Sequence, residues 1–342
     1  MAKQLVRAKA PLRLSFAGGG TDVPPFPAEQ GGLVLNATIN RYVYATLRPR
    51  EDDEIELESL DFGLALRYGA GDPLIFDGQL DLLKAAIRKL WDPATGGFDL
   101  FVRSSAPPGS GLGLSSTVMV AMIGLLREFQ RIPLTDYEIA DHAYVLERQD
   151  LGLNGGLQDQ YAATFGGFNF IEFFGDHVVV NPLRIRPETI NELEHNLLLC
   201  YTGSTHVSDG IITDQTKRFV AGETETVEAL KLQKDLATEM KNALLQGRLL
   251  AFADLLGEAW RQKKRMSPRI ATSFIDEAYE EALKHGAVSG KVTGAGGGGY
   301  MLFYCDYRSK HRVAEALTRM GASVTDFAFD SHGLTTWRAE CV

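Results

Sequence analysis

Short runs of alternating hydrophobic and polar residues dominate the first part of the chain, and this spacing is typical of β-strands. It predicts strands at about 5–16, 34–47, 54–59, 64–68 and 98–104. Hydrophobic positions that recur every three to four residues predict helices at about 80–91, 115–130 and 136–150. A glycine-rich turn, "GLNGG", follows, and after it a short helix and two strands over about 167–182.

The pattern changes after Pro187. We expect a strand at about 196–202, a helical tract rich in Glu, Lys, Leu and Ala over 208–286, strands at 287–293 and 300–305, a helix at 309–320 and a strand at 322–330. Strands, then helices, then strands predict an α+β fold, because a doubly wound sheet alternates strands and helices regularly. We place a domain boundary near 185–195, which divides the chain into residues 1–190 and 191–342.

Composition indicates a globular protein of ordinary type. The 342 residues suffice for one large domain or two smaller ones, and 45% hydrophobic and 23% charged residues are common proportions. A net charge of −9 argues against a nucleic-acid surface, which needs a basic stripe. The longest apolar run, "VMVAMIGLL", is too short to cross a bilayer, and no signal peptide is recognisable. Cys200, Cys305 and Cys341 form no CxxC pair, so we expect a reducing, cytoplasmic location.

Three glycine-rich stretches interrupt this pattern: "FAGGGTD" (16–22), "APPGSGLGLSST" (106–117) and "TGAGGGGY" (293–300). In the middle stretch, glycines alternate with other residues from Gly109 to Gly113, and three hydroxyl side chains precede an apolar helical run. Free N–H groups and hydroxyls at a helix N-terminus favour an anion site. In the alternative, Ser115 or Ser116 only caps the helix, which would leave the glycines without a function.

Two better-known phosphate-binding motifs do not fit. A P-loop requires a Lys that the middle stretch lacks. The dinucleotide pattern GxGxxG does occur at Gly294, Gly296 and Gly299, but the strand-like "YMLFYC" follows where a helix is required. A Rossmann dehydrogenase is therefore not expected.

Glu147 falls on the apolar stripe of the helix predicted at 136–150, together with Ala140, Ala143 and Tyr144. A carboxylate that faces a core needs a compensating partner. Either a nearby arginine, such as Arg148 or Arg103, or a metal ion would serve.

Asp159 and Arg13 each allow two interpretations. Asp159 begins a short helix, where it either complements the helix dipole or enters a cleft shared with the loop before Ser115. Arg13 alternates with Leu12 and Leu14 on a strand, so it is solvated if they face the core. If the strand is covered on both sides, Arg13 is buried and needs an anion.

The segments "APLRLSFAGGGTD", "PPGSGLGLSST" and "KVTGAGGGGYMLF" resemble, in order and spacing, the three motifs of the GHMP small-molecule kinases, a family named for galactokinase, homoserine kinase, mevalonate kinase and phosphomevalonate kinase. Within that family, "FAGGGTDVPPF", "YTGSTHVSD" and "EAWRQKKRMSPRI" are most similar to D-glycero-D-manno-heptose 7-phosphate kinases. Galactokinases carry a Glu-His pair where this chain has Gly19 and Gly20. The resemblance implies a ribosomal-protein-like N-terminal domain and a ferredoxin-like C-terminal domain.

The resemblance also implies the roles of residues. Asp159 would be the catalytic base and Arg13 would lower its pKa, while Ser115 (or Ser116) and Glu147 would hold Mg²⁺. The ATP phosphates would be bound by the middle stretch, that is, by Pro108, Gly109, Ser110, Gly111, Leu112, Gly113, Ser115, Ser116 and Thr117.

The sugar would be bound by Gly19, Gly20, Thr21, Asp22, Gly296 and Gly297. For its phosphate we select Lys263 and Lys264 from "RQKKRMSPR", although such a basic run is often a solvated helix face.

The expected reaction transfers the γ-phosphoryl group of ATP to the anomeric hydroxyl of D-glycero-D-manno-heptose 7-phosphate, on a route to GDP-heptose. The partners are then small molecules rather than a membrane or nucleic acid, and a homo-oligomer is compatible with the sequence. The alternatives are another sugar 1-kinase (for L-fucose, or galactokinase-like) and a binding protein of the same fold without activity. Retention of Ser115, Glu147, Asp159 and Arg13 together argues against the last.

Overall fold

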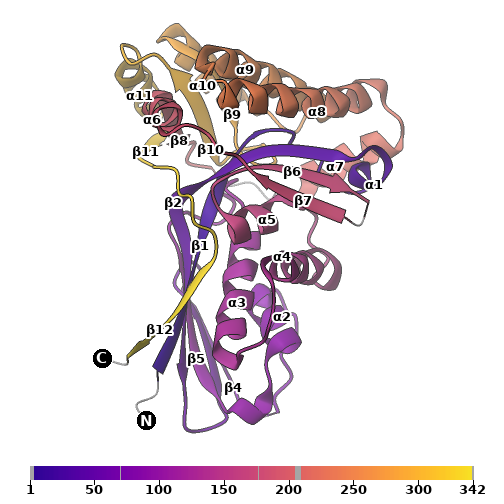
Figure 1. The fold of residues 1–342 in the computed structure, drawn as a ribbon, viewed down its shortest axis with the longest axis vertical. Helices are drawn as coiled ribbons and strands as arrows, with labels where there is room; N and C mark the ends of the chain where they lie inside the picture. Colours follow the sequence, from indigo (N-terminus) through magenta and orange to yellow (C-terminus); the bar gives the residue numbers. More distant parts are fainter. Residues whose placement is uncertain (1–3, 70, 176, 205–208, 341–342) are drawn as a thin grey trace.

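The computed structural model describes residues 4–69, 71–175, 177–204 and 209–340, and these form two β-sheets (Figure 1). The larger sheet has the order β12-β1-β2-β5-β3-β4, and β6 and β7 continue it from β2. Its strands are β1 (Gln4–Ala17), β2 (Gly32–Pro49), β3 (Ile55–Ser59), β4 (Leu64–Tyr68), β5 (Phe98–Ser104), β6 (Phe168–Phe174), β7 (His177–Pro182) and β12 (Thr335–Glu340). The smaller sheet has the order β11-β8-β10-β9, with β8 (Leu197–Tyr201), β9 (Ala287–Val292), β10 (Tyr300–Cys305) and β11 (Ser323–Thr325).

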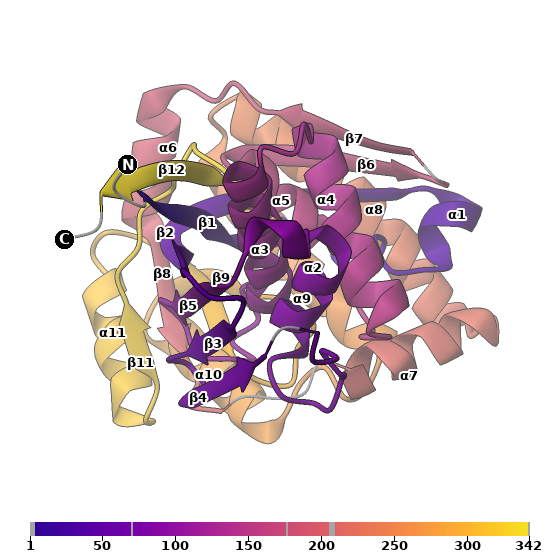
Figure 2. The same cartoon turned by 90° about the horizontal axis from the view of Figure 1, so that it is seen from below.

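Helices cover both sheets, as the two perpendicular views show (Figures 1 and 2). The first part of the chain contributes α1 (Phe26–Gln30), α2 (Asp81–Leu90), α3 (Leu114–Gln130), α4 (Asp136–Tyr144) and α5 (Gln158–Phe165). The second part contributes α6 (Pro187–Asn196), α7 (Asp209–Val220), α8 (Thr224–Leu245), α9 (Leu249–Met266), α10 (Ser273–Lys284) and α11 (Lys310–Arg319). Helices α3 and α5 pack on β1 and β2, and α8 packs on the same two strands, so the two parts of the chain share these strands.

Burial along β1 explains the position of Arg13. Side chains alternate between buried and partly exposed over the first half of the strand, but from Ala10 to Ala17 every residue is buried. Helices from both parts of the chain cover this second half. Arg13 is therefore buried, with only 4% of its surface exposed, and it requires an anionic partner.

One hydrophobic core runs from the larger sheet into the helices of the second part. The Phe16 ring of β1 packs edge-on against Phe252 of α9 at a centroid distance of 5.3 Å, and lies 6.2 Å from Phe168 of β6. Residues of α8 such as Met240 belong to the same cluster. The two sheets are thus connected by packed side chains rather than by a flexible linker alone.

Most predicted elements occur within a few residues of their expected bounds, and the α+β class is confirmed. Several differences are corrections. Helices α1 and α6 were not expected, and α6 opens with Pro187 and has Glu188 in its first turn, within the region 185–195. The helix expected at 136–150 changes to a π-helix at Val145–Asp150. The strand expected at 322–330 ends at Thr325, and the unpredicted β12 pairs antiparallel with β1.

The last strand returns to the larger sheet, so the division into 1–190 and 191–342 stays a prediction. In the described part of the chain no helix is long and apolar enough to cross a membrane. Cys200 and Cys305 are buried free thiols, and Cys341 lies outside the described residues, as do 205–208 of "YTGSTHVSD".

Candidate active site

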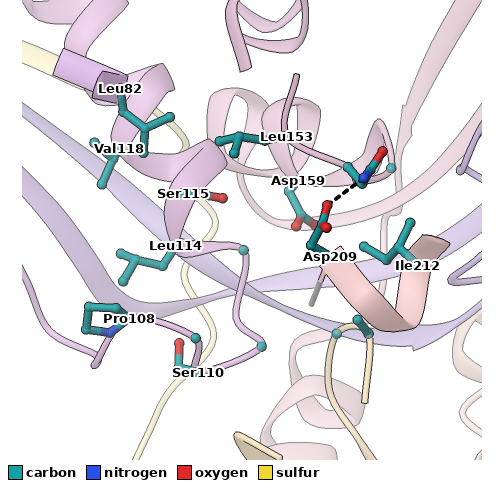
Figure 3. A pocket seen from close by; sticks show the side chains of 18 of the residues that line it. Leu82, Pro108, Ser110, Leu114, Ser115, Val118, Leu153, Asp159, Asp209 and Ile212 are labelled. Carbon is teal, nitrogen blue, oxygen red and sulfur yellow. Dashed lines mark hydrogen bonds between the residues drawn. The ribbon is translucent and has the colours of Figure 1, made fainter. Parts of the chain in front are cut away.

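The three glycine-rich stretches meet at one cavity of about 820 Å³. We call Gly18–Asp22 the first glycine loop, Pro108–Gly113 the second and Thr293–Gly299 the third. Each contributes to the cavity wall, and the N-termini of α3 and α5 do so as well. Figure 3 shows Pro108, Ser110, Ser115 and Asp159 around this space.

The second glycine loop presents its backbone to the cavity. Gly109, Gly111 and Gly113 have φ values of 72°, 79° and 79°, a left-handed conformation that other residues rarely adopt. Within the described residues, the N–H groups of 109–113 donate no hydrogen bond to the protein. Together with the first turn of α3, whose N–H groups lack helical acceptors, they form an anion-binding concavity.

Not every residue predicted for ATP belongs to this wall. Pro108, Gly109, Ser110, Gly111, Gly113 and Ser115 line the cavity. Leu112 is a core residue, Ser116 is buried, and the hydroxyl of Thr117 donates to the carbonyl of Gly113 at 2.8 Å. The side chains of these three residues therefore support the loop from behind, while the N–H groups of Leu112 and Ser116 belong to the loop and to the first turn of α3.

Arg13 and Asp159 form a paired unit beside the second loop. Two guanidinium nitrogens of Arg13 donate to the two carboxylate oxygens of Asp159 at 2.6 and 2.9 Å, and a third donates to the Gly111 carbonyl at 2.7 Å. A Cβ atom on Gly113 would lie 3.1 Å from the Asp159 carboxyl carbon, so the glycine gives the acid room. Of the two interpretations for each residue, the buried arginine and the acid in a shared cleft are the ones observed.

Glu147 is fully buried behind the cavity wall and accepts several hydrogen bonds. The hydroxyls of Ser115 and Ser116 donate to its two carboxylate oxygens at 2.6 Å each, and Gln160 donates at 2.8 Å. Arg148 lies 3.2 Å from it, whereas Arg103 stacks on Tyr44 instead. The carboxylate is thus compensated without a metal.

The donor set nevertheless suits Mg²⁺, which prefers hard oxygen ligands and binds with few protein groups when phosphates supply the rest. Ser115 is on the cavity wall, directly against Glu147. Among the described residues, no cluster of three or more His, Cys, Asp or Glu side chains could hold a metal ion. A magnesium site here would therefore depend on a bound phosphate.

The first glycine loop forms another part of the cavity wall. Asp22 is buried and accepts from the N–H groups of Gly20 at 2.9 Å and Gln158 at 3.2 Å, and its burial raises its pKa. Gly19, Gly20 and Asp22 line the cavity. Thr21 does not, because its hydroxyl donates to the carbonyls of Gly18 and Leu33 at 2.7 and 3.0 Å, so its predicted contact with the sugar is corrected to a structural one.

Lys263 and Lys264 lie in different environments. Lys263 is buried at the cavity, with its ammonium 3.9 Å from the Cβ position of Gly19, and burial lowers its pKa to about 8. Lys264 does not line the cavity and pairs with Asp276 at 3.1 Å, so the structure does not bring it to the predicted sugar site. Helical spacing could have distinguished the two lysines in the sequence, because Lys263 falls on the buried stripe that contains Trp260 and Met266.

The third glycine loop packs backbone against the second. A Cβ on Gly294 would lie 2.6 Å from the Gly111 carbonyl oxygen, and the Tyr300 N–H donates to the Ser110 carbonyl at 3.0 Å. Gly294 and Ala295 line the cavity, whereas Gly297 donates to the Ile270 carbonyl at 2.8 Å. Gly296 also packs against Ile270. Neither of these two glycines, which were predicted to bind the sugar, therefore lines the cavity.

Sequence reasoning missed the apolar end of the cavity and several polar residues. The apolar end is built from β4's preceding turn, α2, α3 and the loop after the π-helix, and includes Phe62, Leu80, Leu82, Val118, Leu151 and Leu153 (Figure 3 labels three of them). Its residues have the spacing of ordinary core positions, so no sequence signal marks them. Gln158, Gln215 and Arg148 also line the cavity.

Comparison with known proteins matches this chain to two family models. The model for the N-terminal domain of GHMP kinases covers residues 81–167, and the model for their C-terminal region covers 240–323. A D-glycero-alpha-D-manno-heptose 7-phosphate kinase from Campylobacter jejuni subsp. jejuni serotype O:2 is 41% identical, over 97% of this chain and 99% of that protein. The chain belongs to the GHMP kinase family.

Two solved structures support this GHMP kinase assignment. The crystal structure of a D-glycero-D-manno-heptose 1-phosphate kinase from Bacteroides thetaiotaomicron has a TM-score of 0.82 and 38% identity, covering 98% of this chain and 100% of the other. A putative sugar kinase from Campylobacter jejuni has a TM-score of 0.81 and 40% identity, covering 98% of both chains. Membership confirms the resemblance, the two-domain GHMP kinase fold and ATP-dependent phosphotransfer as the class of reaction.

Proposed function

We propose that this GHMP kinase transfers the γ-phosphoryl group of ATP to the anomeric hydroxyl of D-glycero-D-manno-heptose 7-phosphate. The observation that carries the proposal is the Arg13–Asp159 pair, held at 2.6 and 2.9 Å between the second glycine loop and the Lys263 side of the cavity. The names of the relatives support a heptose phosphate as the acceptor.

In this reaction the anomeric oxygen forms a bond to the γ-phosphorus as the bond from that phosphorus to the β,γ-bridging oxygen breaks, so ADP leaves. Asp159 accepts the hydroxyl proton, and an anomeric hydroxyl is more acidic than an ordinary alcohol. Arg13 holds the carboxylate through two hydrogen bonds and stays beside the transferring group. Phosphoryl transfer requires this kind of alignment and charge neutralisation more than covalent catalysis.

The nucleotide would extend from the second glycine loop into the apolar end of the cavity. Free N–H groups of 109–113 would receive the phosphates, and Leu80, Leu82 and Val118 would surround the base. Ser115, next to Glu147, is the hydroxyl placed to hold Mg²⁺, since Ser116 does not reach the wall. Bound there, the ion would supply positive charge against the phosphates.

Lys263 supports a phosphorylated acceptor over a free sugar. Its buried ammonium donates no hydrogen bond to a carboxylate within the described residues, although Asp22 is close enough to raise its pKa. A buried cation without a bonded partner favours an anionic ligand. We place the 7-phosphate there, and the product on a route to nucleotide-activated, GDP-linked heptose.

The test is ATP consumption measured with a panel of acceptors: heptose 7-phosphate, heptose 1-phosphate, L-fucose and galactose. We expect turnover with heptose 7-phosphate and a 1,7-bisphosphate product by ³¹P NMR. Turnover restricted to free fucose or galactose would contradict the proposal. Turnover restricted to heptose 1-phosphate would also contradict it, because the phosphoryl group would then go to a hydroxyl other than the anomeric one.

A further inference from the structure

The last residues of β1 lie under the first glycine loop, and one buried side chain from the other sheet binds them. We propose that Lys291 of β9 is a positioning residue, which fixes the end of β1 so that Arg13 and the first glycine loop keep their places around the acceptor. The inference rests on the proposed function only for the identity of that acceptor.

Lys291 is connected to β1 by two hydrogen bonds. Its ammonium nitrogen donates to the carbonyl oxygens of Ser15 and Phe16, both at 2.9 Å, and its side chain is only 3% exposed. Buried donors and acceptors that lose each other incur the full cost of their desolvation. The contact therefore fixes two neighbouring carbonyls of β1 relative to the smaller sheet.

The pairing of β1 with β2 is irregular at these two residues. Ser15 pairs with Asn36 of β2, but Ala17 pairs with Leu35, so the register shifts at Phe16. Such a bulge leaves one residue without a ladder partner and bends the strand. Lys291 donates to the carbonyls at this shift, immediately before the chain enters the first glycine loop.

The residues just before and just after this bulge belong to the candidate active site. Arg13 lies two residues before Ser15, and Gly19 lies three residues after Phe16 at the cavity wall. Lys291 itself is two residues from Thr293, whose carbonyl oxygen is 2.6 Å from the Cβ position of Gly111. Lys291 thus binds the segment of β1 between Arg13 and the first glycine loop, and it lies on the strand that leads into the third.

Lys291 does not line the cavity, so it acts through these backbone contacts. Burial, assisted by the nearby Lys263 and Arg13, holds the pKa of Lys291 well below its usual value. Its contribution is therefore the donated hydrogen bonds rather than a charge presented to the ligand. An arginine, which keeps its charge and is longer, is not expected to replace it.

The experiment compares the wild-type protein with Lys291→Met, which is one atom shorter, stays unbranched and removes the donor. We expect amide hydrogen exchange at residues 15–22 to accelerate at least about ten-fold. We also expect kcat/KM for the sugar phosphate to fall about 10- to 100-fold, since small displacements of aligned groups have effects of that size. The KM for ATP should change less than about three-fold, because the second loop keeps its contacts with Tyr300.

Lys310→Met is the matched control, because Lys310 also donates to a carbonyl, that of His195 at 2.6 Å, but away from the cavity. Its exchange at 15–22 should equal that of the wild type. If Lys291→Met fails to fold, Lys291→Gln retains a shorter donor and serves in its place. Unchanged exchange at 15–22, or equal losses for sugar and ATP, would overturn the proposal. Wild-type protein inactive on heptose 7-phosphate would instead refute the proposed function, while the exchange data still decide the role of Lys291.

Discussion

Asp159 and Arg13 lie 146 positions apart in the sequence, yet their side chains meet in a two-pronged ion pair. The pair leaves the carboxylate aimed at the cavity with its orientation fixed. Because the base is oriented before the substrate binds, the entropy cost of aligning it does not add to the activation barrier.

Replacing this base tests its role most directly. We expect Asp159→Asn to lower kcat by about 100- to 10,000-fold, because the amide cannot accept the proton. ATP affinity should persist, since the second loop binds through its backbone. Steady-state assays measure the loss of kcat, and a fluorescence titration measures the affinity for ATP.

The control for that variant is Asp276→Asn, which removes an exposed carboxylate that pairs with Lys264. Its kcat should match the wild type. Full activity in Asp159→Asn would refute the assignment of the base.

The protonation of Lys263 should determine how kcat/KM for the sugar phosphate falls at alkaline pH. With its pKa lowered to about 8 by burial, this lysine is protonated below pH 8 and neutral above it. Affinity for a phosphorylated sugar therefore falls as the pH rises through that value, and kcat/KM for the sugar should decline there. Steady-state assays between pH 6 and 10, with stable buffers and saturating ATP, measure this decline.

In Lys263→Met the decline should disappear and kcat/KM should be low throughout. Lys264→Met, one residue along and exposed to solvent, should reproduce the wild-type profile. A decline that survives in Lys263→Met would mean that another group titrates.

At the scale of elements, the second and third glycine loops are in backbone contact, so they behave as one unit. Gly111→Ala should show this, because its added Cβ would lie 2.6 Å from the Thr293 carbonyl oxygen at a φ of 79°. The left-handed conformation alone costs about 1–2 kcal/mol, and the collision adds to it. We expect a loss of more than about 2 kcal/mol in the free energy of unfolding, with weakened ATP binding.

Gly222→Ala separates the two effects. Gly222 has a similar φ of 70°, but no atom lies within 4 Å of its Cβ position. Urea unfolding should show only the conformational cost of about 1–2 kcal/mol, and ATP titration should show wild-type affinity. Equal losses in both variants would contradict the close contact between the loops.

How far the sequence predicts these elements depends on whether the signal is local. The second glycine loop was predictable, because alternating glycines before hydroxyls at a helix start describe an anion site by themselves. Glu147 was predictable as a buried acid from helical spacing. Its hydrogen bonds to Ser115 and Gln160 were not predictable from spacing, because these residues lie on other helices. The apolar end of the cavity was not predictable, since its leucines have the spacing of any core.

Two misses show where local reasoning was incomplete. The start of α6 carried a readable signal, Pro187 at the first position followed by Glu188. β12 carried almost none, because none of its residues is buried and the strand therefore has no apolar face to recognise. Its place in the sheet depends on β1, more than three hundred residues away.

At the scale of the whole molecule, the shared core predicts that the two sheets unfold together. Phe252 packs against Phe16 between the two parts, so Phe252→Ala should lower the free energy of unfolding by about 3–5 kcal/mol. Both sheets should still lose structure in a single transition. Trp91 near β5 and Trp260 in α9 report on the two parts separately when the other tryptophans are replaced by phenylalanine.

Leu250→Ala in the same helix is the control, because Leu250 is 70% exposed and its loss should hardly change stability. Two separate transitions for the two tryptophans would refute the shared core.

The pairing of Gln4 with Glu340 has a consequence for how the protein is made. On the ribosome, β1 is synthesised long before β12, so the edge of β1 that pairs with residues 335–340 lacks this partner until that strand has been made. A free strand edge is a template for pairing with other chains. Translation products of this kinase that stop before residue 335 would therefore present such an edge, and a pause before that residue would prolong the period in which a nascent chain can associate wrongly.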